Sequence, residues 1–284
     1  MKVLAIALNT CREAVRNKIL YSILFFACLL TGICAAFGAV SLGDTIKFIK
    51  DFSLLSISLF GVVTTVVLGV TLLSKELGKR TIYNILSKPV ARWHFLIGKF
   101  LGLLATLVLM MALMTVVLLC VLWFFEGRVD WALLPVVGAM LLELAVLLAV
   151  AMFFSSIVVT PALAGLFTAA TFVAGRSSAW LTYFFTPETP AALRYTMRAL
   201  YAALPHLDRF YVADQVVSGQ SLPPSYYLQL SLHGAAYAGL LLLLSVVIFP
   251  SAPRTVPVMG TPRSSWSVAE LSRNAEIGLN SRIG

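Results

Sequence analysis

Charged side chains are scarce in this sequence of 284 residues, of which 12% are Asp, Glu, Lys or Arg and 60% are hydrophobic. A soluble domain carries about 25% charged residues, so this chain has too little polar surface to remain in solution. Its hydrophobic residues form long blocks instead of the one-sided stripes of soluble helices. The composition therefore excludes an ordinary soluble protein and indicates a membrane protein.

A nucleotide-binding motif is also missing. A P-loop requires Gly, four residues, and then Gly-Lys-Ser or Gly-Lys-Thr. The nearest stretch, Gly78-Lys79-Arg80-Thr81, has Leu73 in place of the first glycine and Arg80 in place of the hydroxyl residue. If ATP drives this protein, we expect a partner chain to bind the nucleotide.

Cysteine and histidine are few and scattered, with four and three residues respectively. None of the cysteines forms a Cys-x-x-Cys pair, and no serine or threonine has His and Asp at positions that suggest a catalytic triad. We therefore expect neither a metal site nor enzymatic activity in this chain. The net charge of +9 comes from basic residues beside hydrophobic blocks, which favours contacts with lipid headgroups over nucleic-acid binding.

The hydrophobic blocks predict an all-α membrane protein with six transmembrane helices. The predicted spans cover residues 19–42, 52–74, 95–125, 131–154, 161–176 and 227–249. They form one permease domain, residues 19–250. Residues 251–284 are rich in Pro, Ser, Arg and Asn, and we expect a poorly ordered cytoplasmic tail there.

Two amphipathic stretches lie outside the spans. In residues 1–18, Leu4, Leu8, Cys11 and Val15 form one apolar stripe, which predicts an N-terminal helix in the headgroup plane. The alternative, the charged front of a signal peptide, fits less well because the following apolar run exceeds a signal core. Between the last two spans, a second stripe runs from Leu193 to Leu204 and predicts an outer interfacial helix. A seventh span there would bury two arginines.

Loop charges predict the orientation. Basic residues cluster before the first span, between the second and third, and after the sixth, so these three segments should share the cytoplasmic side. Both termini are then cytoplasmic, as expected for a multi-pass protein of a bacterial inner membrane. A short loop on the other side should hold mixed charges, namely Asp44, Lys47, Lys50 and Asp51.

Two charged residues fall within or at the end of spans. Glu143 lies near the middle of the fourth span, where a carboxylate must face protein or water. It could line a substrate path, or it could join two helices through a threonine such as Thr64 or Thr65. Arg176 lies at the outer end of the fifth span, where we expect its side chain to extend to the interface.

The segment from Lys75 to Lys99 carries the most information. It reads as a short amphipathic helix, a proline break and a return to the membrane, with Ile82, Ile85 and Leu86 as an apolar ridge. Such a ridge can insert into a groove on a soluble partner. Periodicity alone equally allows a helix that lies on the headgroups.

This segment resembles the loop after the second span of the type-2 ABC transporter permease family, where an E…RTI…L…KPV.R..FL.GK pattern recurs. The matching residues are Glu76, Arg80, Thr81, Ile82, Leu86, Lys88, Pro89, Val90, Arg92, Phe95, Leu96, Gly98 and Lys99. The resemblance extends over about residues 3–250. Further matches are the stretch from Arg12 to Lys18, then Phe154-Ser155-Ser156 with Thr160-Pro161, and the Pro205–Phe210 stretch, where His206 stands in place of the family's Asn.

The resemblance implies a permease subunit without its own nucleotide site or cofactor, driven by separate ABC ATPase subunits that hold ATP and Mg. Residues around Glu76–Arg92 would form the coupling helix that docks on the ATPase. The loop with Ser155, Ser156, Thr160 and Pro161 would be a second, smaller contact. A second permease copy or a related chain would complete the dimer, and membrane lipid would surround it.

Two other functions stay open from the sequence. A non-transporting membrane module could anchor a cytoplasmic ATPase. An ion-coupled secondary transporter would be expected to show inverted repeats and broken spans, and no convincing repeat is found. The apolar spans weakly favour a lipid-like, peptide or hydrophobic substrate, although similar permeases also serve assembly of exported metalloenzymes, where the cargo is sulfur- or metal-related.

Overall fold

The computed structural model describes residues 2–40, 45–78, 92–158, 160–185, 190–218 and 223–248. All regular elements in these ranges are helices. The long ones are α1 (Lys2–Val15), α2 (Lys18–Val40), α3 (Thr45–Gly78), α5 (Arg92–Glu126), α6 (Leu133–Ile157), α7 (Pro161–Arg176), α9 (Ala191–Ala203) and α11 (Pro224–Ile248). The short ones are α8 (Ser178–Leu181), η1 (Thr182–Phe185), η2 (Leu207–Phe210) and α10 (Ala213–Val217).

Five of the described helices are long and apolar enough to cross a membrane: α2, α3, α5, α6 and α11. The chain is therefore an all-α membrane protein. The remaining predicted span is α7, whose 16 residues extend about 24 Å, less than the ~30 Å of the hydrocarbon core. The count of six spans stays a prediction. The predicted tail, residues 251–284, lies outside the described residues.

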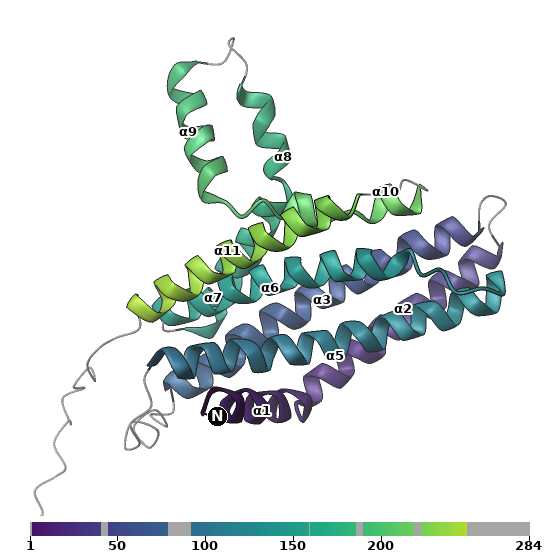
Figure 1. Cartoon of the computed structure of the whole chain (residues 1–284), viewed down its shortest axis with the longest axis horizontal. Coiled ribbons are helices and arrows are strands. Elements are labelled where there is room, and N and C mark those ends of the chain that lie inside the picture. The colour runs from purple at the N-terminus through teal and green to yellow at the C-terminus, as the bar shows by residue number, and fades with distance from the viewer. Residues whose placement is uncertain are drawn as a thin grey trace, which may run out of the picture. The chain divides into compact units, whose positions relative to one another are not determined.

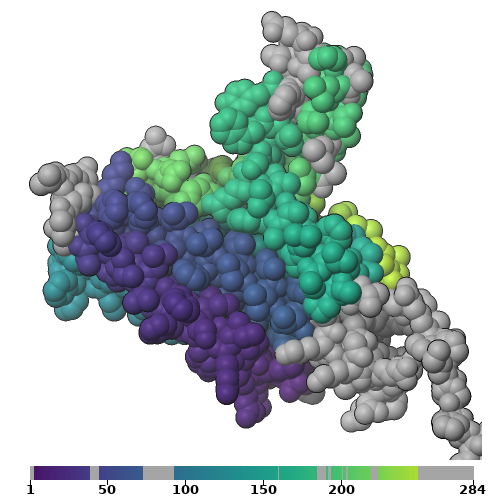
Figure 2. All heavy atoms as spheres, turned by 180° about the vertical axis from the view of Figure 1, so that it is seen from behind, coloured from purple at the N-terminus to yellow at the C-terminus, as the bar shows by residue number. Residues whose placement is uncertain are grey.

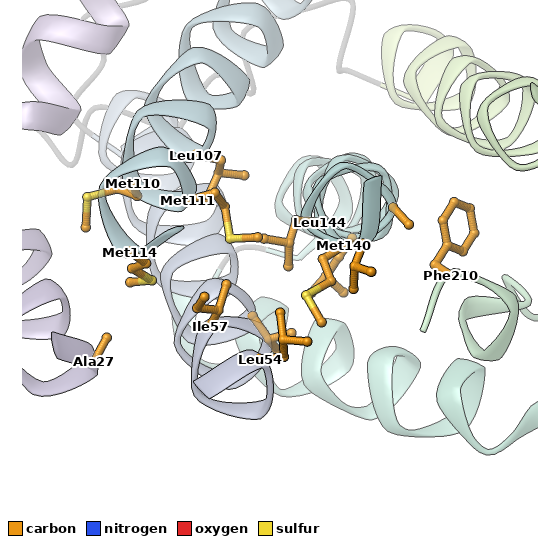
Figure 3. Close-up of a cluster of buried hydrophobic side chains, with 14 of the residues drawn as sticks. Ala27, Leu54, Ile57, Leu107, Met110, Met111, Met114, Met140, Leu144 and Phe210 are labelled. Atoms are coloured by element: carbon orange, nitrogen blue, oxygen red, sulfur yellow. The ribbon is translucent and has the colours of Figure 1, made fainter. Parts of the chain in front are cut away.

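The bundle core lies between α3, α5 and α6, whose axes run lengthwise beside one another (Figure 1). Figure 3 shows Met111 of α5 and Leu144 of α6 pointing toward each other, with Ile57 and Leu54 of α3 nearby. Burial of such large apolar side chains contributes close packing rather than hydrophobic stabilisation in a lipid environment. α6 is the most enclosed of the five candidate spans, with 72% of its apolar window buried, so it is the central helix.

α2 lies at the surface and presents aromatic side chains outward. Phe25, Phe26 and Phe37 are all exposed, and the surface of α2 is visible beside that of α3 in purple and blue in Figure 2. In a membrane protein such a face suits lipid or another helix rather than water.

The sequence placed Lys47, Lys50 and Asp51 in a loop, and this is wrong because α3 already begins at Thr45. No Gly or Pro interrupts the chain between residues 45 and 60, so helical hydrogen bonding continues past the apolar part. The charge of Lys50 is compensated: its Nζ lies 2.7 Å from Asp130 Oδ2 and 3.6 Å from Glu126 Oε2. These contacts join α3 to the end of α5 and to the following loop.

Candidate functional site

One end of the bundle brings together the helix ends on either side of residues 79–91. Lys99, in the second turn of α5, is 2% exposed, and its Nζ donates a hydrogen bond of 3.1 Å to the carbonyl oxygen of Leu72 near the end of α3. The ammonium also lies 5.4 Å from the centre of the Phe95 ring. A buried cation needs such partners because desolvation is costly. Lys99 therefore ties the end of α3 to the start of α5.

The end of α6 and the start of α7 pack at the same end. Val70 of α3, Ala151 of α6 and Ala164 of α7 form one buried cluster. Leu96 of α5 packs with Met152 of α6 in another. The ends of α3, α5, α6 and α7 thus pack together at one end of the bundle, here named the base.

The residues predicted for the second, smaller contact lie on this base. Ser155 is buried, and its hydroxyl has no hydrogen-bond partner within the part of the chain that the structure describes. Ser156 Oγ donates to the Phe153 carbonyl oxygen at 2.7 Å. Thr160 and Pro161 are exposed at the start of α7, where Pro161 occupies the first turn, a position that tolerates its missing N–H.

The residues predicted for the main contact are only partly described. Glu76 belongs to the last turn of α3 and Arg92 is the first residue of α5. The predicted coupling helix itself, with Arg80, Thr81, Ile82, Ile85, Leu86, Lys88 and Pro89, lies outside the described residues.

α1 lies along the first turns of α5, next to this base (Figure 1). Two glycines of α5 allow the close approach. A Cβ on Gly98 would meet Ile6 Cβ at 2.9 Å, and a Cβ on Gly102 would lie 2.5 Å from the Ala7 carbonyl oxygen. Small residues at four-residue spacing let helices in membranes pack backbone to backbone. The N-terminal helix is therefore held by α5.

A second polar feature lies deeper in the bundle, where Glu143 and Arg176 form an ion pair. Arg176 NH1 is 3.1 Å from Glu143 Oε1. The Glu143 side chain is 1% exposed and that of Arg176 25%. The carboxylate is therefore enclosed by protein and neutralised by one guanidinium, as charges in a membrane require.

This pair corrects two predictions. Arg176 turns inward to Glu143 instead of extending to the interface, because α7 is short and ends near the level of Glu143. Glu143 joins α6 to α7 through Arg176 and not through a threonine. Thr64 and Thr65 donate instead to the carbonyl oxygens of Phe60 and Gly61 in their own helix, at 2.7 and 2.8 Å.

The sequence did not identify two residues that complete this cluster. Arg176 NH1 donates to Ser58 Oγ of α3 at 3.2 Å, and the guanidinium carbon lies 4.1 Å from the centre of the Tyr211 ring. That distance is typical of a cation–π contact. Ser58 is one of many hydroxyl residues in apolar helices, and Tyr211 follows η2. Neither residue therefore lies in a sequence pattern that would indicate a contact with Arg176.

The geometry defines a polytopic helical membrane protein in which α3, α5, α6 and α7 pack together at the base and Glu143 pairs with Arg176 inside the bundle. A family model described as "ABC-2 family transporter protein" matches residues 4–250. The chain belongs to this family and is a permease component of an ABC transporter. A comparison with curated proteins gave no match.

Proposed function

We propose that this permease is powered by a separate ABC ATPase that docks on residues 79–91 and on the turn between α6 and α7. Permeases of this family work with ABC ATPase subunits, often as dimers. In this proposal Glu76, Arg80, Lys88 and Arg92 provide the polar rim of the main contact, and ATP and Mg bind in the partner, not in this chain.

The observation that carries the proposal is the base formed by the four helix ends. The hydrogen bond between Lys99 and Leu72 joins the two helices that lead into and out of residues 79–91. The cluster of Val70, Ala151 and Ala164 joins them to the turn that carries Thr160 and Pro161. A force applied by the ATPase at either contact would therefore move the bundle as a rigid body.

The proposal fixes the orientation. The base and both termini face the cytoplasm of a bacterial cell, the helices cross its inner membrane, and two permease copies or related chains pair with two ATPases. The transported substrate is unidentified. The apolar character of the spans favours a hydrophobic molecule over a small ion.

Co-purification tests the proposal. We expect an ABC ATPase to be encoded beside this chain and to co-purify with it at a fixed stoichiometry. A variant with glycine and serine in place of residues 80–88 should lose the ATPase while the permease still accumulates in the membrane. An ATPase that stays bound to this variant at full stoichiometry would contradict the proposed docking site. Replacement of the exposed Asp214 by lysine, between η2 and α11, is the control and should leave the complex intact.

A further inference from the structure

Residues 205–213, here named the outer segment, contain the short helix η2 and the first residue of α10, and part of the segment is enclosed by the bundle. Leu207, Phe210, Val212 and Ala213 are each at most 1% exposed. Backbone outside regular helices is tolerated at membrane depth only where protein or water surrounds it. The buried side chains of the outer segment are therefore part of the core of the bundle.

The outer segment closes over the end of α7. A Cβ on Gly175 would lie 2.6 Å from the Pro205 carbonyl oxygen and 3.1 Å from Leu207 side-chain atoms. Phe210 lies on the side of α6 away from Met111, as Figure 3 shows. Its ring atoms would be 3.2 Å from a Cβ on Gly234 of α11. Both glycines thus make room for this segment.

Polar contacts fasten the rim of the outer segment. Ser178 Oγ donates to Asp208 Oδ1 at 2.7 Å, and the Tyr226 hydroxyl donates to the Arg209 carbonyl oxygen at 2.8 Å. Both contacts lie on the part of the segment nearest to α8 and to the start of α11. The Tyr226 contact is exposed, so water can replace it, whereas Ser178 is fully buried.

The inner side of the outer segment is held by a cation–π contact with Arg176. The Tyr211 ring lies on the guanidinium of Arg176, which also pairs with Glu143 and donates to Ser58. One planar cation thus connects the outer segment to α3 and α6. A lysine could neutralise Glu143, but its ammonium cannot make a planar stack and a forked set of hydrogen bonds at the same time.

We propose that Arg176 is a positioning residue for transport: through Tyr211 it holds the outer segment in the bundle, and the segment leaves this place in each ATP-driven cycle. The inference rests on the proposed function, because the ATPase supplies the motion and the orientation places the segment outside. Arg176 acts through the segment and not on the substrate.

Thiol labelling tests the proposal in the complex with its ATPase, in right-side-out membrane vesicles. The parent chain has Cys11, Cys28, Cys34 and Cys120 replaced by alanine and carries Val212→Cys, a buried position. A membrane-impermeant maleimide is added outside. Exposed Asp214→Cys in the same background is the accessibility control.

Two matched pairs of variants separate positioning from charge neutralisation. Arg176→Lys keeps the charge opposite Glu143 but loses the stack, and Tyr211→Leu removes the ring that Tyr211→Phe retains. We expect labelling of Val212→Cys to rise at least tenfold in Arg176→Lys and in Tyr211→Leu, and to stay at the parent rate in Tyr211→Phe. A role limited to neutralising Glu143 predicts no change in any of the three, and that result would overturn the proposal.

A second labelling measurement tests whether the outer segment moves during the ATP-driven cycle. In the parent, ATP inside the vesicles should speed labelling of Val212→Cys several-fold relative to a non-hydrolysable analogue, while Asp214→Cys labels equally fast with both. An equal rate at Val212→Cys means that the segment does not move, and it contradicts the inference alone. Failure of Asp214→Cys to label from outside contradicts the proposed orientation, and the outer position of the segment with it.

Discussion

The Nζ atom of Lys99 hydrogen-bonds the carbonyl oxygen of Leu72 across two helices whose sequence neighbours, residues 79–91, form the proposed ATPase contact. Lys99 stands in the Gly-Lys pair that ends the family-like pattern. The pattern therefore continues from the proposed docking surface into the bundle, where its last residue fixes the geometry of the base.

Replacing Lys99 by methionine should loosen this base. The substitution keeps the length of the side chain but removes the charged hydrogen bond, and a loss of about 1–3 kcal/mol is expected for such a bond. Thermal unfolding in detergent should occur at lower temperature than in the parent. Lys99→Arg, which keeps a donor and the charge, should lie between them, and equal unfolding of Lys99→Met and the parent would contradict the role of this bond.

The glycines of α5 predict how α1 is held. Gly102→Ala places a methyl group 2.5 Å from the Ala7 carbonyl oxygen, so α1 must shift, at a cost of about 1–3 kcal/mol. Proteolysis of the N-terminal helix in detergent should become faster. Gly138→Ala on α6 is the matched control, because a Cβ there meets nothing within 4 Å, and it should leave the rate unchanged.

From the Glu143–Arg176 pair we expect that removing one charge lowers the free energy of unfolding more than replacing both charges with apolar side chains. Glu143→Gln leaves a partly buried guanidinium without its counter-charge and should cost about 3 kcal/mol of stability. The double variant Glu143→Leu with Arg176→Met removes both charges and should regain most of that loss. Unfolding in a denaturing detergent series measures both, and equal stability of the single variant and the parent would show that the pair is not needed for folding.

The same variants address a substrate role for Glu143. If the carboxylate lined the substrate path, Glu143→Gln would abolish transport even where the protein is stable. Since Glu143 is enclosed and paired, we expect the remaining folded Glu143→Gln protein to transport its substrate at a rate set by its abundance. Transport normalised to folded protein decides between these roles.

The loop between α5 and α6 predicts a pH dependence. The hydrogen bond from Lys50 holds the pKa of Asp130 below its usual value, against partial burial, with the Ala132 N–H adding to the effect. Because the folded-state pKa is lowered, this contribution to stability is complete above the ordinary pKa of about 4 and is lost as the pH falls through the folded value. Unfolding measured between about pH 5 and pH 3 should show a slope that Asp130→Asn reduces.

Hydrophobic block length predicted the all-α membrane fold, because long apolar runs in a bilayer can satisfy their backbone only as helices. It did not predict that α3 begins at Thr45, since the charges of Lys47, Lys50 and Asp51 hide a helix that continues beyond the apolar part. Lys50 is neutralised by Asp130, which lies eighty positions further along the chain. Such a pairing depends on the tertiary structure, so local sequence patterns do not reveal it.

The pairing of Glu143 with Arg176 was within reach of the sequence. α6 and α7 are antiparallel and joined by a short turn, so residues equally far from that turn lie at the same depth in the bundle. Glu143 and Arg176 are about equally far from the turn. The stacking of Tyr211 on Arg176 could not be predicted from the sequence, because it depends on the path of the outer segment. The residues of the predicted docking helix rest on a family-like pattern and on periodicity, and they stay predictions.

The central claim is that a separate ATPase drives this bundle through the segment after α3. Its most direct test is the double charge reversal Glu76→Lys with Arg80→Glu in the complex reconstituted in vesicles. The account predicts that the permease still inserts, and that ATP hydrolysis no longer drives transport or responds to substrate. Full transport together with full substrate-stimulated ATP hydrolysis in this variant would contradict it.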